Sequence, residues 1–433
     1  MTRMKDSGIE WIGEMPEEWG LKPIKYLVST PVTDGPHETP TLYDDGIPFL
    51  SAESVKNGIL DSRYKRGYIS ETAHKIFSRK VSPQKNDIFI VKSGATTGNV
   101  GIVTTDEIFD IWSPLALVRT RSDLANQKFI YYFMLSDAFT KQIQNKWSFG
   151  TQQNIGMGVI EKIKLVVPPL DEQTQITNFL DKKVAQLDSV KSLLEEQVKT
   201  LEDYRQSLIY ETVTKGLDKT VPLKDSGVDW IGQIPEGWGI GRLKDFVKFQ
   251  TGTTPPQSIG VNQDESGVPW FKPGDFSDNS IDLLSSENHI THEVVMQYNL
   301  SVYPKKTILL VGIASIGKVG YSAQPSYSNQ QITALRTIGE IYPRYLAYLM
   351  FSSGRFIKET ALYTVVPIIN NQYLATMRLV LPSENEQKII VEYLDRKLEQ
   401  INQMIAIKKE QIENINKQRQ TLIYDYVTGK RRV

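Results

Sequence analysis

Apolar side chains recur every seven residues along two long stretches of the chain. In the first stretch, about residues 171–213, leucine occupies the seventh position five times in succession, and Val184 and Val198 lie four residues after two of these leucines. The second stretch has the same spacing, with Lys408 as an exception. Such a pattern predicts long helices that pair along an apolar seam. The predicted seam residues are Leu180, Leu187, Leu194, Leu201 and Leu208 in the first stretch and Leu394, Ile401, Ile415 and Leu422 in the second.

The two predicted helices are separated in the sequence by a complete globular region, so an antiparallel pair is the simplest way to join their seams. Pro169 and Pro382 stand directly before the two stretches, where proline is compatible with a helix start. We therefore expect an antiparallel coiled coil that separates two globular regions. The alternative is that each long helix packs only on its own globular region.

Residues 22–165 and 240–380 alternate short strand-like runs with brief amphipathic helices. Residues 87–91 and 307–311 are continuous apolar runs that predict buried strands. Residues 129–139 and 345–356 have the spacing of amphipathic helices. We predict an α+β protein with two α/β-type globular regions and a pseudo-twofold internal repeat.

The repeat is visible directly in the sequence. Residues 5–13 (KDSGIEWIG) recur as residues 224–232 (KDSGVDWIG), an offset of 219. The helical stretches repeat at an offset of 214, whereas the globular regions between them diverge. Repeated flanks around different interiors predict two related modules that present two different surfaces. The expected domains are 1–168 and 218–381, each a globular region, and 169–217 and 382–433, each a helix.

Composition narrows the class of protein only modestly. The 433 residues include no cysteine, which excludes disulfides and thiolate metal sites, and the net charge is zero. Residues 22–165 carry 18 Lys and Arg against 14 Asp and Glu, so a slight basic excess lies in a globular region. With no apolar run of membrane-spanning length and no signal-like N-terminus, we expect a cytoplasmic protein without membrane contact.

No motif predicts catalysis. Residues 312–318 (GIASIGK) fit a phosphate-binding loop up to the lysine, but Val319 replaces the Ser or Thr that would hold magnesium. A glycine turn after a buried strand explains this segment better. His289 and His292 are three residues apart, which does not fit the metalloprotease spacing, so we expect a turn or surface role and no metal site.

Nucleic-acid binding has more support. Basic and aromatic residues alternate at 63–68 (RYKRGY), and basic side chains neutralise phosphates. Polar loops can read base edges, and such loops occur at 33–39, 93–99 and 147–154 in the first half. In the second half the candidate loops are 251–257, 315–318 and 326–331. The alternative for each residue is a solvated polar turn.

The candidate DNA-contacting residues come from these loops and from neighbouring basic positions. In the first half they are Thr33, His37, Thr39, Arg63, Lys65, Arg66, Lys92, Ser93, Thr96, Thr97, Asn99, Ser148, Thr151, Gln152 and Gln153. In the second half they are Thr251, Thr253, Thr254, Gln257, Lys272, Ser315, Lys318, Tyr327, Asn329 and Gln330.

The whole chain resembles the specificity subunits of type I restriction–modification enzymes. The resemblance is carried by residues 5–19 and their second copy, by the helix entries PPLDEQ (168–173) and LPSENEQ (381–387), and by the paired heptad helices. It implies two target recognition domains that each read one half of a split, asymmetric double-stranded DNA site. It also implies that the helices set the gap between the halves.

The resemblance further implies partners. The helices would dock two methyltransferase (modification) subunits that carry S-adenosylmethionine and methylate adenine. Restriction subunits would bring ATP and Mg²⁺ for translocation and cleavage. This chain would then hold no cofactor and no catalytic residue. Two alternatives remain open: a specificity module for a fused nuclease–methyltransferase, and a coiled-coil scaffold that binds protein but not DNA.

Overall fold

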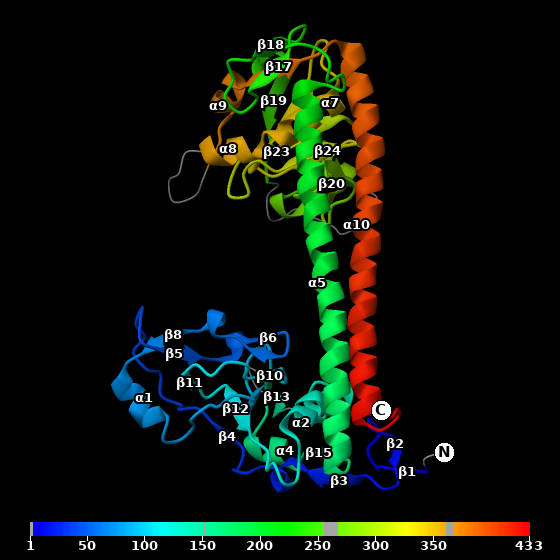
Figure 1. Ribbon diagram of the computed structural model, residues 1–433. Helices are drawn as coiled ribbons and strands as arrows, with labels where there is room; N and C mark the ends of the chain where they lie inside the picture. Colours follow the sequence, from blue (N-terminus) through cyan, green and yellow to red (C-terminus); the bar gives the residue numbers. More distant parts are fainter. Residues whose placement is uncertain (1–2, 147, 150–152, 255–266, 361–367) are drawn as a thin grey trace. The chain divides into compact units, whose positions relative to one another are not determined.

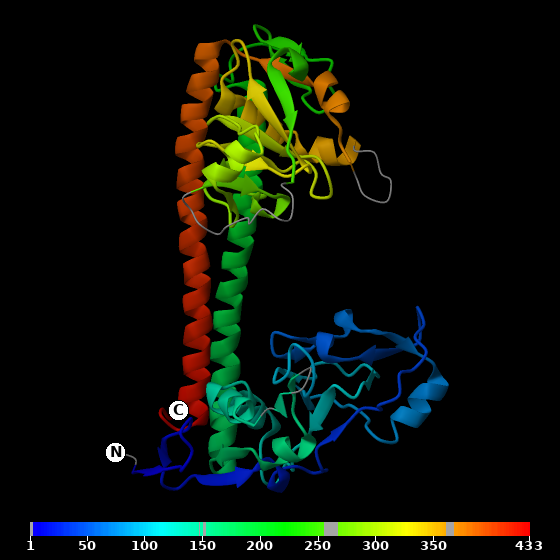
Figure 2. The ribbon, with the colours of Figure 1, turned by 180° about the vertical axis from the view of Figure 1, so that it is seen from behind.

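The computed structural model describes residues 3–146, 148–149, 153–254, 267–360 and 368–433 (Figures 1 and 2). The chain forms two compact units. Unit 1 comprises Met1–Leu194 and Glu410–Val433, and unit 2 comprises Glu195–Lys409. Each unit therefore holds one globular region together with part of both long helices.

Unit 1 is built on a six-stranded sheet in the order β4-β12-β9-β10-β7-β6, with only β7 and β10 parallel to each other. A second sheet of three strands has the order β11-β5-β8. The strands of these sheets are β4 (Thr33–Asp34), β5 (Ile47–Leu50), β6 (Val55–Lys56), β7 (Ile59–Leu60), β8 (Gly67–Ile69), β9 (Ile88–Val91), β10 (Val100–Ile102), β11 (Asp110–Ile111) and β12 (Leu115–Val118). The short strand pairs are β1 (Met4–Asp6) with β2 (Glu14–Pro16), β3 (Gly20–Pro23) with β15 (Lys164–Val167), and β13 (Ser148–Phe149) with β14 (Gln153–Asn154). The helices of the globular region are α1 (Glu71–Phe77), α2 (Gln127–Met134), α3 (Asp137–Gln144) and α4 (Met157–Lys162).

Unit 2 repeats this plan. Its main sheet has the order β19-β26-β23-β24-β21 and its smaller sheet the order β22-β20-β25. The strands are β16 (Leu223–Asp225), β17 (Gln233–Pro235), β18 (Gly239–Arg242), β19 (Val247–Thr251), β20 (Val268–Phe271), β21 (Asp282–Leu283), β22 (His289–Ile290), β23 (Thr307–Val311), β24 (Val319–Ser322), β25 (Tyr327–Ser328), β26 (Ile332–Thr337) and β27 (Arg378–Leu381). The helices are α6 (His292–Gln297), α7 (Pro343–Ser352), α8 (Gly354–Thr360) and α9 (Asn371–Thr376). The predicted α+β class and internal repeat are confirmed.

The predicted buried strands are central. β9 and β23 are buried at every position and lie in the middle of their sheets. In unit 1, Ile88 and Ile90 pack toward α2, whereas Phe89 and Val91 belong to a second apolar cluster. A strand covered on both faces shows a continuous apolar run instead of alternation, which is why the sequence pattern identified it.

Each predicted amphipathic helix of the globular regions is in fact two short helices. α2 ends before Ser136 and α3 follows it, and the same break separates α7 from α8 at Ser353. The serine hydroxyls donate to the carbonyls of Phe133 and Met350, three residues earlier. A side chain that bonds the preceding turn competes with helical hydrogen bonding, so the apolar spacing continues across a real break.

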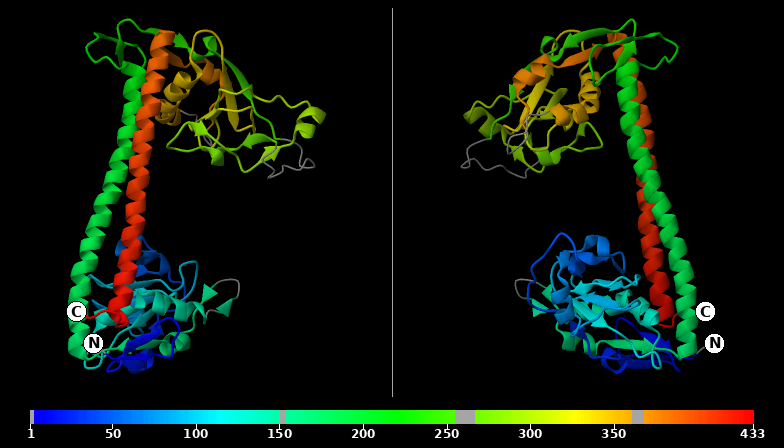
Figure 3. Two further views of the ribbon diagram at one scale, coloured as in Figure 1. Left: turned by 90° about the vertical axis from the view of Figure 1, so that its right-hand side faces the viewer. Right: turned by 60° about the vertical axis from the view of Figure 1, so that its left-hand side comes forward.

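The long helices are α5 (Leu170–Lys215) and α10 (Glu384–Val427), close to the predicted limits. In unit 1 the rings of Phe179 and Tyr426 are 4.6 Å apart, and Arg419 Nε lies 3.2 Å from Asp188 Oδ1. Residue numbers thus rise along α5 as they fall along α10, so the pair is antiparallel (Figure 3).

Unit 2 has the same antiparallel pairing. Lys408 Nζ donates to Gln197 Oε1 at 2.5 Å, and Arg205 Nη1 donates to Asn402 Oδ1 at 3.1 Å. The predicted seam residues are buried or half-buried in both units. Leu180 also belongs to the core of the globular region of unit 1, so this helix packs on its own region as well as on its partner.

The same contacts fasten the helices to the globular region in each unit. Trp19 Nε1 donates to Glu172 at 2.9 Å, and Trp238 Nε1 donates to Glu386 at 3.1 Å. The Tyr424 hydroxyl donates to backbone carbonyls of the first repeated segment, as the Tyr210 hydroxyl does to those of the second. The sequence repeat at residues 5–19 and 224–238 therefore encodes a helix-docking element.

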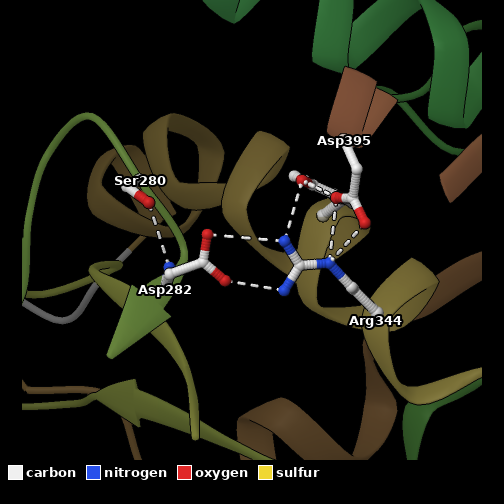
Figure 4. A network of polar contacts seen from close by, with 5 residues as sticks. Ser280, Asp282, Arg344 and Asp395 are labelled. Atoms are coloured by element: carbon white, nitrogen blue, oxygen red, sulfur yellow. Dashed lines mark hydrogen bonds and ion pairs between the residues drawn. The ribbon is translucent and has the colours of Figure 1, made fainter. Parts of the chain in front are cut away.

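A charged network adds a further fastening in unit 2. Arg344 on α7 lies between Asp282 on β21 and Asp395 on α10 (Figure 4). Its guanidinium donates to both oxygens of Asp395 at 2.9 Å and to Asp282 Oδ1 at 2.6 Å, while the Tyr348 hydroxyl donates to Asp395 at 2.5 Å. In unit 1, Lys128 and Tyr132 hold Asp181 in the same way. These contacts tie β21, α7 and α10 together in unit 2, and α2 and α5 in unit 1.

Within the part of the chain that the structure describes, no helix is both long and apolar enough to cross a bilayer.

Candidate nucleic-acid interface

The three loops predicted in the first half meet at one end of β9. The Ile155 amide donates to the Lys92 carbonyl at 2.8 Å, and the Gly94 amide donates to the Gln153 carbonyl at 3.3 Å. Ser113, which follows β11, donates to the Pro36 carbonyl at 3.2 Å. Segments that are far apart in sequence therefore form one polar surface in unit 1.

Asp34 is the centre of a basic cluster on this surface. Its carboxylate is fully buried and accepts from Lys80 Nζ at 2.7 Å, while Lys92 Nζ and His37 Nε2 lie 2.8 Å and 3.2 Å away. Burial alone would raise the pKa of Asp34, but hydrogen bonds from the two lysines outweigh it and leave the pKa below its ordinary value. The cluster thus holds one negative charge among three basic side chains.

The basic and aromatic residues near 63–68 form a second cluster. Lys65 Nζ lies 4.8 Å from the Tyr68 ring centroid, and the Arg66 guanidinium lies 4.3 Å from that of Trp112. Arg63 instead donates bidentately to Asp61, with Nη2 at 2.6 Å. Sequence reasoning missed Trp112, which comes from a distant loop. Cation–π pairs of this kind leave exposed cationic edges beside flat rings, an arrangement suited to nucleic acid.

The remaining candidates of the first half differ in exposure. Thr39, Thr96 and Asn99 are exposed, whereas Thr97 is buried and its hydroxyl donates to the Gly94 carbonyl at 2.7 Å. Ser93 pairs with Asn154 in an isolated bridge, which places Gln153 beside it. Thr33 is half-buried within β4. Residues Thr151 and Gln152 lie outside the described residues, and Ser148 is placed only as part of β13.

In the second half, the predicted loops 251–257 and 326–331 contact each other, and Gly312, which precedes the third predicted loop, contacts the second of them. The Gly252 amide donates to the Ile332 carbonyl at 3.1 Å, and the Gly312 amide donates to the Gln331 carbonyl at 2.8 Å. The Thr253 hydroxyl bonds that of Tyr327, and the Thr254 hydroxyl donates to Gln330. Gln257 lies outside the described residues.

Asn371 connects two strands of this second surface. Its amide nitrogen donates to the Thr251 hydroxyl at 3.1 Å, and its carbonyl oxygen accepts from the Thr333 hydroxyl at 2.9 Å. Asn329 Nδ2 donates to Gln331 at 3.0 Å. Sequence reasoning missed both residues: Thr333 lies within β26, and Asn371 is the first residue of α9.

Two lysines predicted in unit 2 have other neighbours. Lys318 Nζ donates to the Phe276 carbonyl at 3.1 Å and lies 3.2 Å from Asp278. A lysine held this way supports the structural explanation of the 312–318 loop over phosphate binding. Lys272 Nζ lies 4.6 Å from the Trp270 ring centroid, and Ser315 is exposed.

The histidine expectation was wrong for one residue. His289 lies in β22 and is buried, so it has no turn or surface role. Its position beside Pro269 of β20 makes it part of the small sheet. Among the described residues, no cluster of three or more His, Asp or Glu side chains could hold a metal ion.

In both units a glycine, Gly35 or Gly252, lets the backbone of the first loop pass close to the small sheet. A side chain at Gly35 would stand 2.2 Å from the Ile111 carbonyl oxygen, and one at Gly252 would stand 2.3 Å from the Ser328 carbonyl oxygen. Ile111 and Ser328 are equivalent residues of β11 and β25, which pair in parallel with β5 and β20. Only glycine allows the first loop to pass so close to the small sheet.

Comparison with known proteins identifies the family of this chain. The sequence model for the "Type I restriction modification DNA specificity domain" matches residues 31–200 and 235–416. The chain belongs to this family. The two matches cover the two halves of the repeat, each extending from a globular region into a long helix.

The chain is similar to specificity subunits of type I restriction enzymes over most of their length. The type I restriction enzyme MjaVIII specificity subunit of Methanocaldococcus jannaschii is 24% identical, covering 89% of this chain and 86% of the relative. The EcoR124I/EcoR124II specificity subunit of Escherichia coli is 26% identical, covering 90% and 86%. One chain of a solved type I restriction–modification system has the same fold, with a TM-score of 0.72 at 16% identity over 96% of this chain and 99% of that one.

The family assignment settles the class of function. This chain is a DNA specificity subunit of a type I restriction–modification system, and such subunits are not the catalytic ones. Neither the fused-enzyme alternative nor the protein-only scaffold is favoured. DNA and the other subunits of the system are its partners.

Proposed function

We propose that each globular region reads one half of a bipartite, asymmetric double-stranded DNA target. The observation that carries this proposal is that both regions bring three loops together on the same backbone frame but fill them with different side chains. Equal frames would dock on DNA in the same manner, and unequal side chains would select different bases. The domain limits predicted from the sequence, 1–168, 169–217, 218–381 and 382–433, define the two readers and two helices.

The reading surface in unit 1 combines the Asp34 cluster with the cation–π cluster of Arg66 and Trp112. The basic side chains would neutralise backbone phosphates, and the loop ends at 33–39, 93–99 and 153–154 would reach base edges. In unit 2 the reading surface would combine the hydroxyls and amides around Thr253, Asn329 and Asn371 with the cation–π pair of Lys272 and Trp270.

The long helices would set the gap between the two half-sites and dock two methyltransferase subunits. Two equivalent apolar patches support the docking: Val190 and Leu193 on α5, and Met404 and Ile407 on α10, at the repeat offset of 214. All four side chains are about half exposed although they lie on packed helices. Two like patches on a pseudo-twofold repeat suit two copies of one partner.

Chemistry would then reside on the partner subunits. The methyltransferases would bind S-adenosylmethionine, the restriction subunits would bind ATP and Mg²⁺, and this chain would hold no cofactor. Because the target is intracellular DNA, we place the assembly in the cytoplasm. The nearly balanced charge of the chain fits a subunit whose DNA affinity depends on the assembly.

Methylation mapping tests the proposal. DNA from cells that express this chain with its methyltransferase subunit is compared, by long-read sequencing, with DNA from cells that express the methyltransferase alone. We expect a split adenine-methylated motif only when this chain is present. Absence of any new motif, with both proteins expressed, would contradict the proposed role.

A further inference from the structure

At two pairs of positions with equivalent backbone contacts, the two reading surfaces carry side chains of different charge. Asp34 and Thr251 are equivalent residues. Each directly precedes a close-packed glycine, Gly35 or Gly252. Each also lies in the edge strand of its main sheet, where Asp34 pairs with Ala116 of β12 and Thr251 pairs with Thr333 of β26. Lys92 and Gly312 are equivalent in the same way, since their carbonyls accept from the amides of Ile155 and Ile369. The two positions that hold the charged residues Asp34 and Lys92 in unit 1 therefore hold the uncharged residues Thr251 and Gly312 in unit 2.

In unit 1 this place presents hydrogen-bond donors. Asp34 is fully buried, whereas the side chains of Lys92, Lys80 and His37 are 14%, 44% and 70% exposed. Each lysine ammonium has three hydrogens and no acceptor. Lys80 uses two of its hydrogens on Asp34 and on the Gly35 carbonyl, at 2.7 Å and 2.9 Å, so a third hydrogen is left to point outward. Contact of Lys92 with Asp34 likewise leaves hydrogens for a further acceptor. The carboxylate fixes where the ammonium groups lie, and the cluster keeps a net positive charge at the loop ends.

In unit 2 the place presents donors and acceptors together. Thr251, Thr333 and Asn371 form a neutral chain of hydroxyl and amide groups. Gly312 contributes no side chain where Lys92 stands in unit 1. The chemistry that each surface can recognise at this position must therefore differ.

We infer that Asp34 is a positioning residue that holds Lys92 and Lys80 against the acceptor edge of a guanine in the first half-site. In the major groove guanine presents N7 and O6, both acceptors, which match a donor-only cluster. A mixed donor–acceptor group such as Asn371 matches adenine, which presents N7 as acceptor and its amino group as donor. The inference rests on the proposed function, because it assigns a base class to one of the two proposed readers.

A base edge suits this cluster better than a phosphate. Phosphate contacts position a protein on the duplex but carry no sequence information, whereas base reading needs donors at defined places in a groove. Lys92 is instead largely enclosed and tied to a buried carboxylate that limits its direction. A donor fixed in this way discriminates among bases, as a mobile one does not.

The test uses the chain assembled with its methyltransferase subunits. Methylation motifs are mapped for the wild type, Asp34→Asn, Lys92→Met and Lys80→Gln, with Thr251→Val as the matched variant in unit 2. We expect the unit 1 variants to relax one G·C position in one half-site, lowering discrimination there by about 10-fold or more, and to leave the other half-site unchanged. Thr251→Val should alter only the other half-site. Lys80→Gln keeps the test informative if a variant at Asp34 or Lys92 fails to fold, because Lys80 is the more exposed lysine.

A chemical substitution in the DNA separates base reading from phosphate binding. With the mapped target, 7-deazaguanine replaces the guanine at the relaxed position and thereby removes N7. Binding by the wild-type assembly should weaken, whereas binding by the Lys92→Met assembly should not weaken further. A purely structural effect of Lys92→Met would not remove this sensitivity.

Three results would overturn the inference. A uniform loss of affinity on all sequences, with a salt dependence reduced by about one phosphate contact, would assign the lysines to the backbone. A first half-site without G·C at the affected position, or a change in both half-sites together, would also contradict it. Failure of the proposed function itself has a different signature, which is a wild-type assembly with no bipartite motif.

Discussion

Two buried aspartates in unit 1 have pKa values that are shifted in opposite directions. Two lysines lower the pKa of Asp34 despite its burial, so its contribution to stability is present at neutral pH and is lost only as acid protonates it. Asp110 is also buried, with His74 Nδ1 2.5 Å from its Oδ2. Here burial dominates, and the pKa of Asp110 is raised in spite of the histidine. Asp110 is therefore more stable protonated than an exposed aspartate would be.

Asp110→Asn should reveal this raised pKa as a pH dependence of stability. A group whose pKa is raised on folding stabilises the fold below its unfolded pKa, about 4, and loses that stabilisation as pH rises through the folded pKa. The melting temperature of the wild type, relative to the variant, should fall as the pH rises above about 4, through the raised pKa of Asp110. Asp106→Asn, at an exposed site, serves as the control and should show no such trend. A wild type that gained stability over Asp110→Asn in this range would contradict the assignment.

Arg344→Met should destabilise unit 2. The substitution leaves Asp282 and Asp395 without the guanidinium that joins them. The cost should be about 2 kcal/mol, less than for a fully buried pair because both carboxylates are partly exposed. Urea unfolding measures it, and Arg355→Met, whose ion pair with Glu359 is at the surface, should cost under about 0.5 kcal/mol. Equal effects of the two substitutions would show that the network adds nothing beyond a surface pair.

At the scale of the helices, one polar residue interrupts the seam at equivalent places. Arg205 is buried and donates to Asn402, and its repeat counterpart Arg419 donates to Asp188, the counterpart of Asn402. Burial lowers the pKa of Arg205, which reports the cost of enclosing its charge. Polar seam residues of this kind fix register and orientation at some expense of stability.

The seam makes a paired prediction. Arg205→Met removes the buried charge and should keep or raise stability, by up to about 1 kcal/mol. Asn402→Ala leaves the charge with fewer acceptors and should lower stability by about 1 kcal/mol. In the Arg205→Met background the Asn402→Ala substitution should have little effect, which a double-mutant cycle of unfolding free energies measures. Additive single effects would mean that the two residues do not interact.

The exposed helix patches carry a prediction about assembly. Leu193→Ser and Ile407→Ser each remove one apolar side chain from one proposed docking site, so each should weaken binding of one methyltransferase subunit by about 10-fold or more. Native mass spectrometry should then detect one bound subunit with either variant and none with both. Met296→Ser, at a more exposed apolar residue off the long helices, is the control. Two bound subunits in the double variant would place docking elsewhere.

The elements that sequence predicted well are those defined by local pattern. The heptads gave α5 within two residues at either end, and the continuous apolar runs gave β9 and β23. The breaks at Ser136 and Ser353 were missed because apolar spacing persists through them.

The charge clusters could not be predicted, because they depend on distant parts of the chain. Asp34 meets Lys80 and Lys92 only when β4, the segment after α1 and β9 come together. The polar loops could be named from the sequence as groups, since glycine and polar composition mark them, and their contact with DNA stays a prediction. Which side chains remain outward within a loop, such as exposed Thr96 against buried Thr97, depends on packing.

For the molecule as a whole, the two globular regions are joined to the repeated flanking segments and long helices at equivalent positions. Lys22 and Leu165 are register partners of β3 and β15, and Ile240 and Val380 are register partners of β18 and β27. The chain thus enters and leaves each globular region at two paired residues of one antiparallel strand pair. The interior of the region can change without altering this strand pair.

Exchange of residues 22–165 for the first module of another family member should therefore change one half-site only. The exchange cuts the ladder at Lys22 and Leu165, so the pairing of β3 with β15 survives and the helix contacts of Trp19 and Glu172 stay outside the exchanged segment. Methylation mapping of the chimera with the original methyltransferase should return one new half-site, one old half-site and an unchanged gap. The reciprocal exchange of residues 240–380 should alter the other half. If either chimera changed both half-sites, the surfaces at β9 and β23 would not read independently, and the repeat would be a structural duplication without a division of recognition.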